Sequence, residues 1–330
     1  MTLPSETAPV RPVAENGNRH LIHCPSSWDR YLLDAPSLGE ERFVLTGDLS
    51  VRHPLFNDGP GRFHDPQVTM EAVAEVGALT GHRYFGVPED RTGLFHRFGM
   101  ELTESAPWRR RPSDDVSRMA IDLTAAPANV MNGIPRGLDL RWEVRIDDVR
   151  CGTGTAGMVF LMPKLYRRHL AYSSRVLRGT PDLADEPATR PVPVQPAEVG
   201  RASAENVVVS RPELDSRGRL RVWLMAEAVS PVITGMHDEL TGTHLLESLR
   251  QTALLAAGRS GGLDPARCVI GRTEVNFRAQ AGLDLPIRCV ALADRRTRDA
   301  HGRPAVPVMM TVTQSRRPVA DAVLTVVQDF

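Results

Sequence analysis

The sequence repeats one order of expected elements twice, and this repeat limits the folds that are open to the chain. In each half, a strand pattern precedes an extended segment with a proline, one apolar helix and several further strand patterns. Aligning Glu71 with Glu247 gives an offset of 176 residues, and aligning Pro54 with Pro231 gives 177. A length of 330 residues also favours about two domains. We therefore expect two folding units of the same kind.

Each unit is expected to contain one buried helix. In the first half, Asp65 and Pro66 predict where this helix starts, and Gly81 predicts where it ends. Between Val68 and Thr80 the only charged residues are Glu71 and Glu75, and the other residues are apolar or small. A helix that is apolar on nearly all sides is typically buried in the core of a protein.

The second helix is expected over residues 243–257, with a stop at Gly258. Strand patterns surround both helices, with alternating or continuous apolar residues. These patterns lie at 42–50, 94–102, 116–123, 138–146 and 157–162 in the first half, and at 220–229, 268–279, 285–293, 306–313 and 320–327 in the second. The predicted class is α+β, with two tandem units in which an antiparallel sheet wraps a buried central helix. The two sheets can pair edge to edge.

Proline content marks the expected domain boundaries. Residues 1–18 are polar and proline-rich, which is typical of a flexible tail. Residues 181–200 contain five prolines and few core-forming residues, which is typical of a semi-extended linker. The predicted units are therefore residues 19–180 and residues 201–330.

Composition and motifs argue against several classes of function. The 40 basic and 40 acidic residues cancel, which disfavours electrostatic binding to nucleic acid or to a membrane surface. The uncharged stretch 151–163 is far shorter than the ~20 residues of a membrane span, and no signal-peptide pattern is seen, so we expect a cytoplasmic protein. Four cysteines without a CxxC pair disfavour structural zinc and a disulfide framework. The chain has no HExxH or Walker sequence, so we expect no metal. The glycine-rich segment 152–157 is followed by no helix pattern, which argues against a dinucleotide, and we expect no cofactor.

Three segments of the chain resemble one known family. They are the run 51–58 with the helix that carries Glu71, the run 237–253, and the run 274–286. The second run contains Leu-Leu-Glu-x-x-Arg-Gln, which is the most specific of these patterns. Over about residues 20–330, the chain is similar to the A-factor synthase (AfsA-type) family of actinobacterial hormone biosynthesis. The resemblance implies two tandem hotdog folds, each with a central helix wrapped by an antiparallel sheet.

The resemblance also implies an acyltransferase activity. In this family a β-ketoacyl group moves from an acyl carrier protein to a hydroxyl of dihydroxyacetone phosphate. The phosphorylated ester then condenses to a precursor of γ-butyrolactone, butenolide or furan signals that control antibiotic production. The implied partners are the β-ketoacyl carrier protein and dihydroxyacetone phosphate, in a monomer with an internal pseudo-dimer or in a homodimer. The implied catalytic residues are Glu71, Glu247 and Arg250.

Glu247 and Arg250 lie three residues apart on the second expected helix, so their side chains are neighbours. A solvated ion pair accounts for this spacing, but the helix is otherwise apolar and burying a carboxylate is costly. A glutamate in an apolar tunnel has a raised pKa, which suits a general base. Arg250 either binds the substrate phosphate with its two-pronged guanidinium or orients Glu247, and both roles remain open.

The start of the second helix supplies further candidates, because its first N–H groups are free to form an oxyanion hole. The predicted substrate-binding residues are Gly242, Thr243, His244 and Gln251. The first half has Ala74 where the second has Arg250, so it lacks the cation. A single productive site is the simplest expectation, and Glu71 either faces that site or belongs to a degenerate second one.

Two other classes of function fit the same fold. A hotdog dehydratase or thioesterase, acting on carrier-protein or coenzyme A thioesters, would use a histidine near a helix start, where His64 and His244 lie. A non-catalytic regulator would bind a lactone or acyl ligand without turnover. The product separates these hypotheses: a phosphorylated ester, an enoyl thioester or a free acid. The basic segment 108–111 is either a docking site for an acidic carrier protein or a solvated loop.

Overall fold

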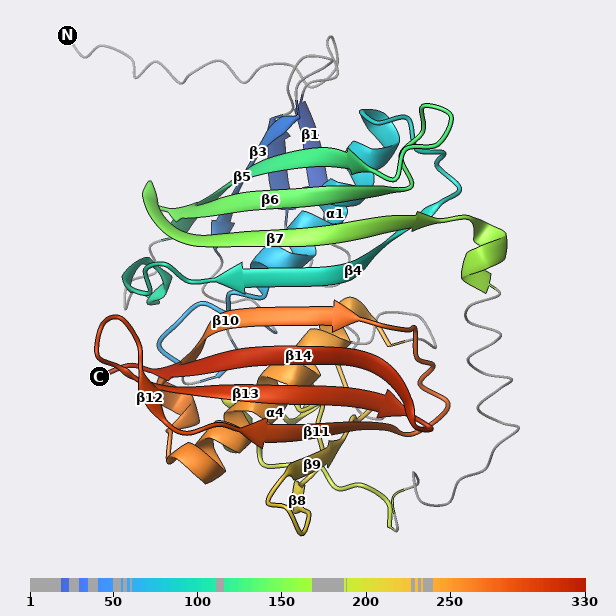
Figure 1. The fold of residues 1–330 in the computed structure, drawn as a ribbon. Helices are drawn as coiled ribbons and strands as arrows, with labels where there is room; N and C mark the ends of the chain where they lie inside the picture. Colours follow the sequence, from blue (N-terminus) through green and yellow to red (C-terminus); the bar gives the residue numbers. More distant parts are fainter. Residues whose placement is uncertain are drawn as a thin grey trace, which may run out of the picture.

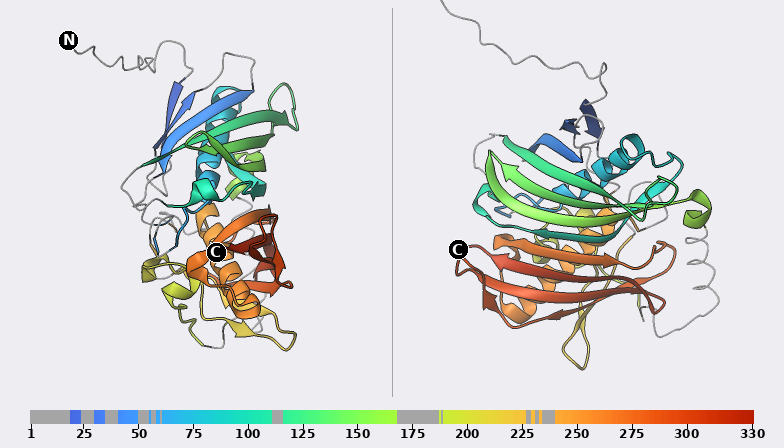
Figure 2. Two further views of the ribbon diagram at one scale, coloured as in Figure 1. Left: turned by 90° about the vertical axis from the view of Figure 1, so that its left-hand side faces the viewer. Right: turned by 45° about the horizontal axis from the view of Figure 1, so that its top comes forward.

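In the computed structural model, one long antiparallel sheet curves around two helices that lie on the same side of it (Figures 1 and 2). The structure describes residues 19–23, 30–34, 41–49, 55, 58–59, 61–110, 116–167, 187, 189–226, 229–230, 233 and 240–330. Within these ranges, no helix is long and apolar enough to cross a membrane.

Each half combines one long helix with a run of strands. The first half consists of β1 (Arg19–His23), β2 (Arg30–Asp34), β3 (Arg42–Leu49), α1 (Val68–Arg83), β4 (Thr92–Glu101), β5 (Ser117–Ala128), β6 (Gly137–Ile146) and β7 (Val149–Leu161). The second half consists of β8 (Glu213–Leu214), β9 (Leu220–Trp223), α4 (Gly242–Gly261), β10 (Cys268–Phe277), β11 (Ile287–Ala293), β12 (Thr297–Arg298), β13 (Pro304–Gln314) and β14 (Arg317–Gln328). Short 3₁₀ helices are η1 (Ala106–Trp108), η3 (Pro196–Val199), η4 (Ala204–Asn206) and η5 (Pro265–Arg267).

The order of the strands is symmetric about the centre of the sheet. It reads β3-β5-β6-β7-β4 in the first half and then β10-β14-β13-β11-β9 in the second. β4 and β10 pair antiparallel at the centre, where Gly99 lies opposite Glu274. The sequence repeat therefore folds as two hotdog units related by a pseudo-two-fold axis through this pair. The predicted α+β class with paired sheets is confirmed.

Both helices continue past the glycines that were predicted to end them. A Cβ atom at Gly81 would lie 2.2 Å from Cζ of Phe160, so this glycine allows α1 to pack closely on β7. Gly258 lies inside α4, which ends instead at Gly262, where the backbone is left-handed with φ 65°. The predicted helix ends are therefore wrong by a few residues. Gly81 serves packing inside α1, and Gly262 rather than Gly258 caps α4.

The two helix starts differ in how they are capped. Before α1, the carboxylate of Asp65 accepts the N–H of Gln67 at 3.1 Å, and the regular helix begins only at Val68. Before α4, the hydroxyl of Thr241 accepts the N–H of His244 at 3.0 Å. Asp65 thus holds a turn that leads into the helix, whereas Thr241 is an N-cap.

Parts of the chain singled out in the sequence lie outside the described residues. These are the tail 1–18, the segments 51–54 and 234–239, and most of 168–188. The described end of the predicted linker packs on the second half, where Val194 and Val199 are buried.

The two halves are expected not to fold separately. Separation would expose the β4 edge of one half and the β10 edge of the other, and unpaired edges promote aggregation. Expressing residues 1–185 and 195–330 alone should give insoluble or molten material, whereas co-expression should restore a soluble complex. Sedimentation and near-ultraviolet circular dichroism measure both results. Two well-folded, independently active halves would contradict the shared sheet.

Candidate active site

A cavity of about 410 Å³ lies where the two halves meet. It is lined by α1, β4 and β7 from the first half and by the start of α4 and the segment after β10 from the second. In Figure 1, the start of β4 and the ends of β7 and β10 come together at the right-hand side of the sheet. The apolar lining consists of Met70, Leu94, Phe95, Met158, Val159, Leu161, Leu240, Leu245, Phe277 and Val319. A cavity of this size and character suits an acyl chain, and we call it the acyl cavity.

Two carboxyl groups of α1 line this cavity one helical turn apart. Glu71 is 6% exposed, and Glu75 is half-buried. Burial raises the pKa of Glu75, and the negative charge of Glu71 raises it further. The other ionisable groups of the lining are His96 on β4, whose pKa is lowered by burial, and Arg278 after β10. Arg278 is 55% exposed and donates to Asp321 at 3.0 Å.

The start of α4 faces the same cavity. Gly242 and Thr243 both line it. Their N–H groups belong to the first turn of the helix and have no intrahelical acceptor, and the helix dipole makes this end electropositive. The predicted oxyanion site and Glu71 are thus brought together across the junction between the halves. This arrangement can hold a thioester carbonyl beside a carboxylate base.

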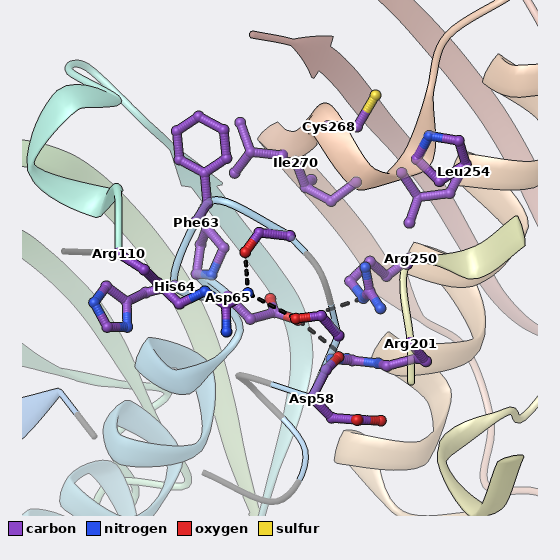
Figure 3. Close-up of a pocket in the computed structure, with 16 residues that line it drawn as sticks. Asp58, Phe63, His64, Asp65, Arg110, Arg201, Arg250, Leu254, Cys268 and Ile270 are labelled. Carbon is purple, nitrogen blue, oxygen red and sulfur yellow. Dashed lines mark hydrogen bonds and ion pairs between the residues drawn. The ribbon is translucent and has the colours of Figure 1, made fainter. Parts of the chain in front are cut away.

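Glu247 lies elsewhere, in a buried ion network. Its carboxylate accepts two hydrogen bonds from Arg201, at 2.9 and 2.6 Å, and two from Arg250, at 3.0 and 3.1 Å. The side-chain amide of Gln251 donates a further bond at 2.6 Å. Asp65 of the first half lies 3.2 Å from Arg201 and 3.4 Å from Arg250 (Figure 3). The network therefore joins the two halves.

The charge environment of Glu247 is the opposite of the one expected from the sequence. Burial alone would raise the pKa of this carboxyl, but the charges and hydrogen bonds of Arg201 and Arg250 outweigh it and lower the pKa. The prediction of a raised pKa in an apolar tunnel is wrong, because two guanidinium groups surround the carboxylate. Arg250 also donates to the carbonyl of Val199 at 3.1 Å. It lines a small cavity beside the network and does not line the cavity of about 410 Å³.

The network occupies the position that the pseudo-two-fold axis relates to the acyl cavity. Glu247 and Gln251 on α4 correspond to Glu71 and Glu75 on α1. Beside the network, a cavity of about 50 Å³ remains (Figure 3). Its lining includes Asp58, Phe63, His64, Arg110, Cys268 and Ile270. Side chains thus leave only a small cavity beside Glu247, whereas the cavity beside Glu71 is large enough for an acyl chain.

Neither predicted histidine lines the acyl cavity. His244 is fully buried in α4, and burial lowers its pKa to about 4. His64 lies beside the small cavity, and burial, followed by the charge of Arg110, lowers its pKa to about 4. Both imidazoles are therefore neutral near pH 7. His244 packs inside the second half and has no place in the acyl cavity.

The basic segment at residues 108–110 has structural partners. Trp108 is fully buried, and its indole N–H donates to the carbonyl of Cys151 at 3.2 Å. Arg109 forms an ion pair with Asp329 at 2.7 Å, and the guanidinium of Arg110 donates to the carbonyls of Gly59 and Gly61. These contacts tie residues 108–110 to the body of the protein, while the side chain of Arg109 stays 51% exposed. Arg111 lies outside the described residues, and docking of a carrier protein at this segment stays a prediction.

Comparison with known proteins agrees with this architecture. A family model described as the A-factor biosynthesis hotdog domain, AfsA, matches residues 5–162 and 183–328. The chain belongs to the AfsA family. A 2-oxo-3-(phosphooxy)propyl 3-oxoalkanoate synthase from Streptomyces griseus subsp. griseus is 29% identical over 267 residues, which cover 79% of this chain and 77% of the relative. A synthase of the same name from Streptomyces coelicolor is 29% identical over 243 residues, 72% of this chain and 71% of the relative.

One solved structure has a fold similar to that of the AfsA-family chain. The 12:0-ACP thioesterase from Umbellularia californica superposes with a TM-score of 0.50 at 10% identity, over 87% of this chain and 94% of that chain. This similarity shows the fold alone. The family match and the named synthases show that the chain is an enzyme of the acyltransferase type.

The sequence did not predict the roles of three side chains in this AfsA-family enzyme. Arg201 stands 46 residues before Glu247, and no local pattern connects the two. Asp65 was expected only to cap a helix, whereas it also binds Arg201. Glu75 was noted as a charge on α1 without a role, although its spacing of four residues from Glu71 places both on one helix face.

Proposed function

We propose that this AfsA-family enzyme transfers a β-ketoacyl group from an acyl carrier protein to a hydroxyl of dihydroxyacetone phosphate. The product is a phosphorylated ester that condenses to a butenolide or furan precursor. The observation that carries the proposal is the acyl-sized cavity in which Glu71 faces the start of α4. The relatives support it, because their name describes the ester of a 3-oxo acid with a phosphorylated hydroxyketone.

In the proposed reaction, the acyl chain occupies the apolar lining and the thioester carbonyl points to the N–H groups of Gly242 and Thr243. Glu71 takes the proton from the acceptor hydroxyl, whose oxygen attacks the carbonyl carbon. The N–H groups stabilise the negative charge that forms on the carbonyl oxygen. The proposal gives binding of the acceptor phosphate to Arg278, which supplies a guanidinium among the described lining residues.

The proposal gives Glu247, Arg250 and Gln251 a supporting role. They fix α4 to the first half through Arg201 and Asp65, and thereby hold the start of α4 against the acyl cavity. His244 packs behind the same helix start. This division leaves one productive site in each chain.

The test is the product. Purified protein is incubated with a β-ketoacyl carrier-protein thioester and dihydroxyacetone phosphate, and the products are identified by mass spectrometry. We expect the phosphorylated ester and the free thiol of the carrier protein, with much slower transfer to dihydroxyacetone. A free acid would identify a thioesterase, an enoyl thioester would identify a dehydratase, and binding without turnover would identify a regulator. Each of these three results would overturn the proposal.

A further inference from the structure

The cavity contains one carboxyl group more than a general base requires. Glu71 and Glu75 lie on consecutive turns of α1, and both line the cavity that the start of α4 faces. Residues on consecutive turns of one helix face have side chains within reach of each other. Two carboxyl groups that share a partly buried site raise each other's pKa, so ionisation of one disfavours ionisation of the other.

We infer that Glu75 is a second catalytic residue, which donates a proton to the departing thiolate while Glu71 accepts the proton of the attacking hydroxyl. The inference rests on the proposed function, because it concerns the same reaction in the same cavity. It assigns opposite protonation states to the two groups, with Glu71 ionised and Glu75 protonated before the reaction.

The proposed transfer balances in protons and electrons without a further reactant. The O–H bond of the acceptor breaks, its proton goes to Glu71, and the oxygen forms a bond with the thioester carbon. The C–S bond then breaks, the electron pair stays on sulfur, and the sulfur takes the proton of Glu75. Transfer of a proton from Glu71 to Glu75 restores the starting state. The spacing of four residues places the two carboxyl groups on adjacent turns of α1, within reach of each other for this transfer.

The repeat supports a hydrogen-bond donor at this position. On α4, the residues that correspond to Glu71 and Glu75 are Glu247 and Gln251. There the amide of Gln251 donates to the carboxylate of Glu247 at 2.6 Å. A protonated Glu75 carries the corresponding donor in the first half. The difference is that an amide cannot release its proton to a leaving group, whereas a carboxylic acid can.

The groups that face Glu75 favour its protonated form. Glu71 on the same helix adds negative charge, and burial disfavours ionisation. His96 on β4 has a lowered pKa and is neutral near pH 7, and Arg278 after β10 pairs with Asp321. The described lining from β7 and α4 carries no ionisable group. Among the described lining residues, the cation Arg278 is thus already paired with a carboxylate, so it offsets the negative charge near Glu75 only weakly.

The test compares two leaving groups in the wild-type and Glu75→Gln enzymes. With an alkyl thioester such as the N-acetylcysteamine ester, the thiolate needs a proton, and we expect kcat/KM of the variant to fall by about 10²-fold. With a thiophenyl ester, the thiolate is stable without a proton, and we expect the variant to come within about threefold of the wild type. Glu71→Gln should lose activity with both esters, because the hydroxyl always needs a base.

The pH dependence gives a second readout. Glu75 acts in its protonated form, so wild-type activity with the alkyl thioester should fall as the pH rises through its raised pKa. This alkaline decline should be absent from the Glu75→Gln variant and retained in Glu75→Asp. Glu89→Gln on the exposed loop after α1 is the matched control and should behave as the wild type. Thermal unfolding identifies any variant that fails to fold.

The outcomes separate this inference from the proposed function. If the wild type forms no ester, the proposed function fails and the role of Glu75 fails with it. If the wild type forms the ester but Glu75→Gln loses equal activity with both leaving groups, or none with either, only the role of Glu75 is overturned. Rescue by the thiophenyl ester is a result that a purely structural role of Glu75 would not produce.

Discussion

The Glu71→Gln variant is expected to turn over about 10²- to 10⁴-fold more slowly than the wild type, while its fold survives. Glutamine has nearly the shape of glutamate, so the packing of α1 around this position is kept. It cannot accept a proton, however, and the acceptor hydroxyl then has to attack without a base. The loss should appear in kcat, because the acyl chain and the acceptor still bind to the remaining cavity lining.

Steady-state formation of the phosphorylated ester, followed by mass spectrometry, measures this loss. Circular dichroism and thermal unfolding of the same preparation confirm that the variant is folded. The Glu89→Gln control changes an exposed carboxylate to the same amide and should keep full activity. Near-normal turnover of Glu71→Gln would remove this residue from the mechanism and leave the cavity without its proposed base.

The sequence predicted the fold well because the fold depends on patterns that repeat. The offset between Glu71 and Glu247 anticipated two units, and the apolar helices anticipated that α1 and α4 would be buried. Helix ends were harder to predict because a glycine has more than one use. Gly81 admits Phe160 against α1, and that contact involves residues 79 positions apart, which a local pattern does not reveal.

The site was only partly predictable for a similar reason. Glu71, Gly242 and Thr243 were selected from the sequence, and the structure brings all three to one cavity. The environment of Glu247 was not predictable, because the direction of a pKa shift depends on which charges the fold brings close. Arg201 and Asp65 come from distant segments of the two halves, and both meet at α4. Local apolar neighbours on the helix therefore gave the wrong direction for this pKa.

The buried network around Glu247 makes stability, rather than turnover, the property most affected by its mutation. Glu247→Ala leaves Arg201 and Arg250 buried with Asp65 as their remaining counter-charge. An uncompensated buried charge costs about 3–5 kcal/mol, so the urea midpoint should fall markedly. At a temperature where the variant is folded, its kcat should fall far less than that of Glu71→Gln, because Glu71 and the N–H groups of Gly242 and Thr243 remain in the cavity.

A double-mutant cycle isolates the pairing from the loss of packing. Arg201→Met alone leaves Glu247 and Asp65 to share the single cation Arg250, and it should also be strongly destabilising. Arg201→Met combined with Glu247→Ala removes one charge of each sign and leaves Arg250 paired with Asp65. The double variant should therefore lose less stability than the sum of the two single losses, by a coupling energy of about 1–3 kcal/mol.

The pH dependence of stability follows from the lowered pKa of Glu247. A carboxyl with a depressed folded-state pKa contributes stability above the ordinary glutamate value, and that contribution is lost as the pH falls toward the folded-state pKa. The folded-state pKa is about 2, so the wild type should lose more stability than Glu247→Gln as the pH is lowered from about 5 toward 2. Additive single losses in the cycle, together with equal acid sensitivity of the two proteins, would show that the network contributes no pairing energy. In that case, strand pairing between β4 and β10 would hold the two halves together.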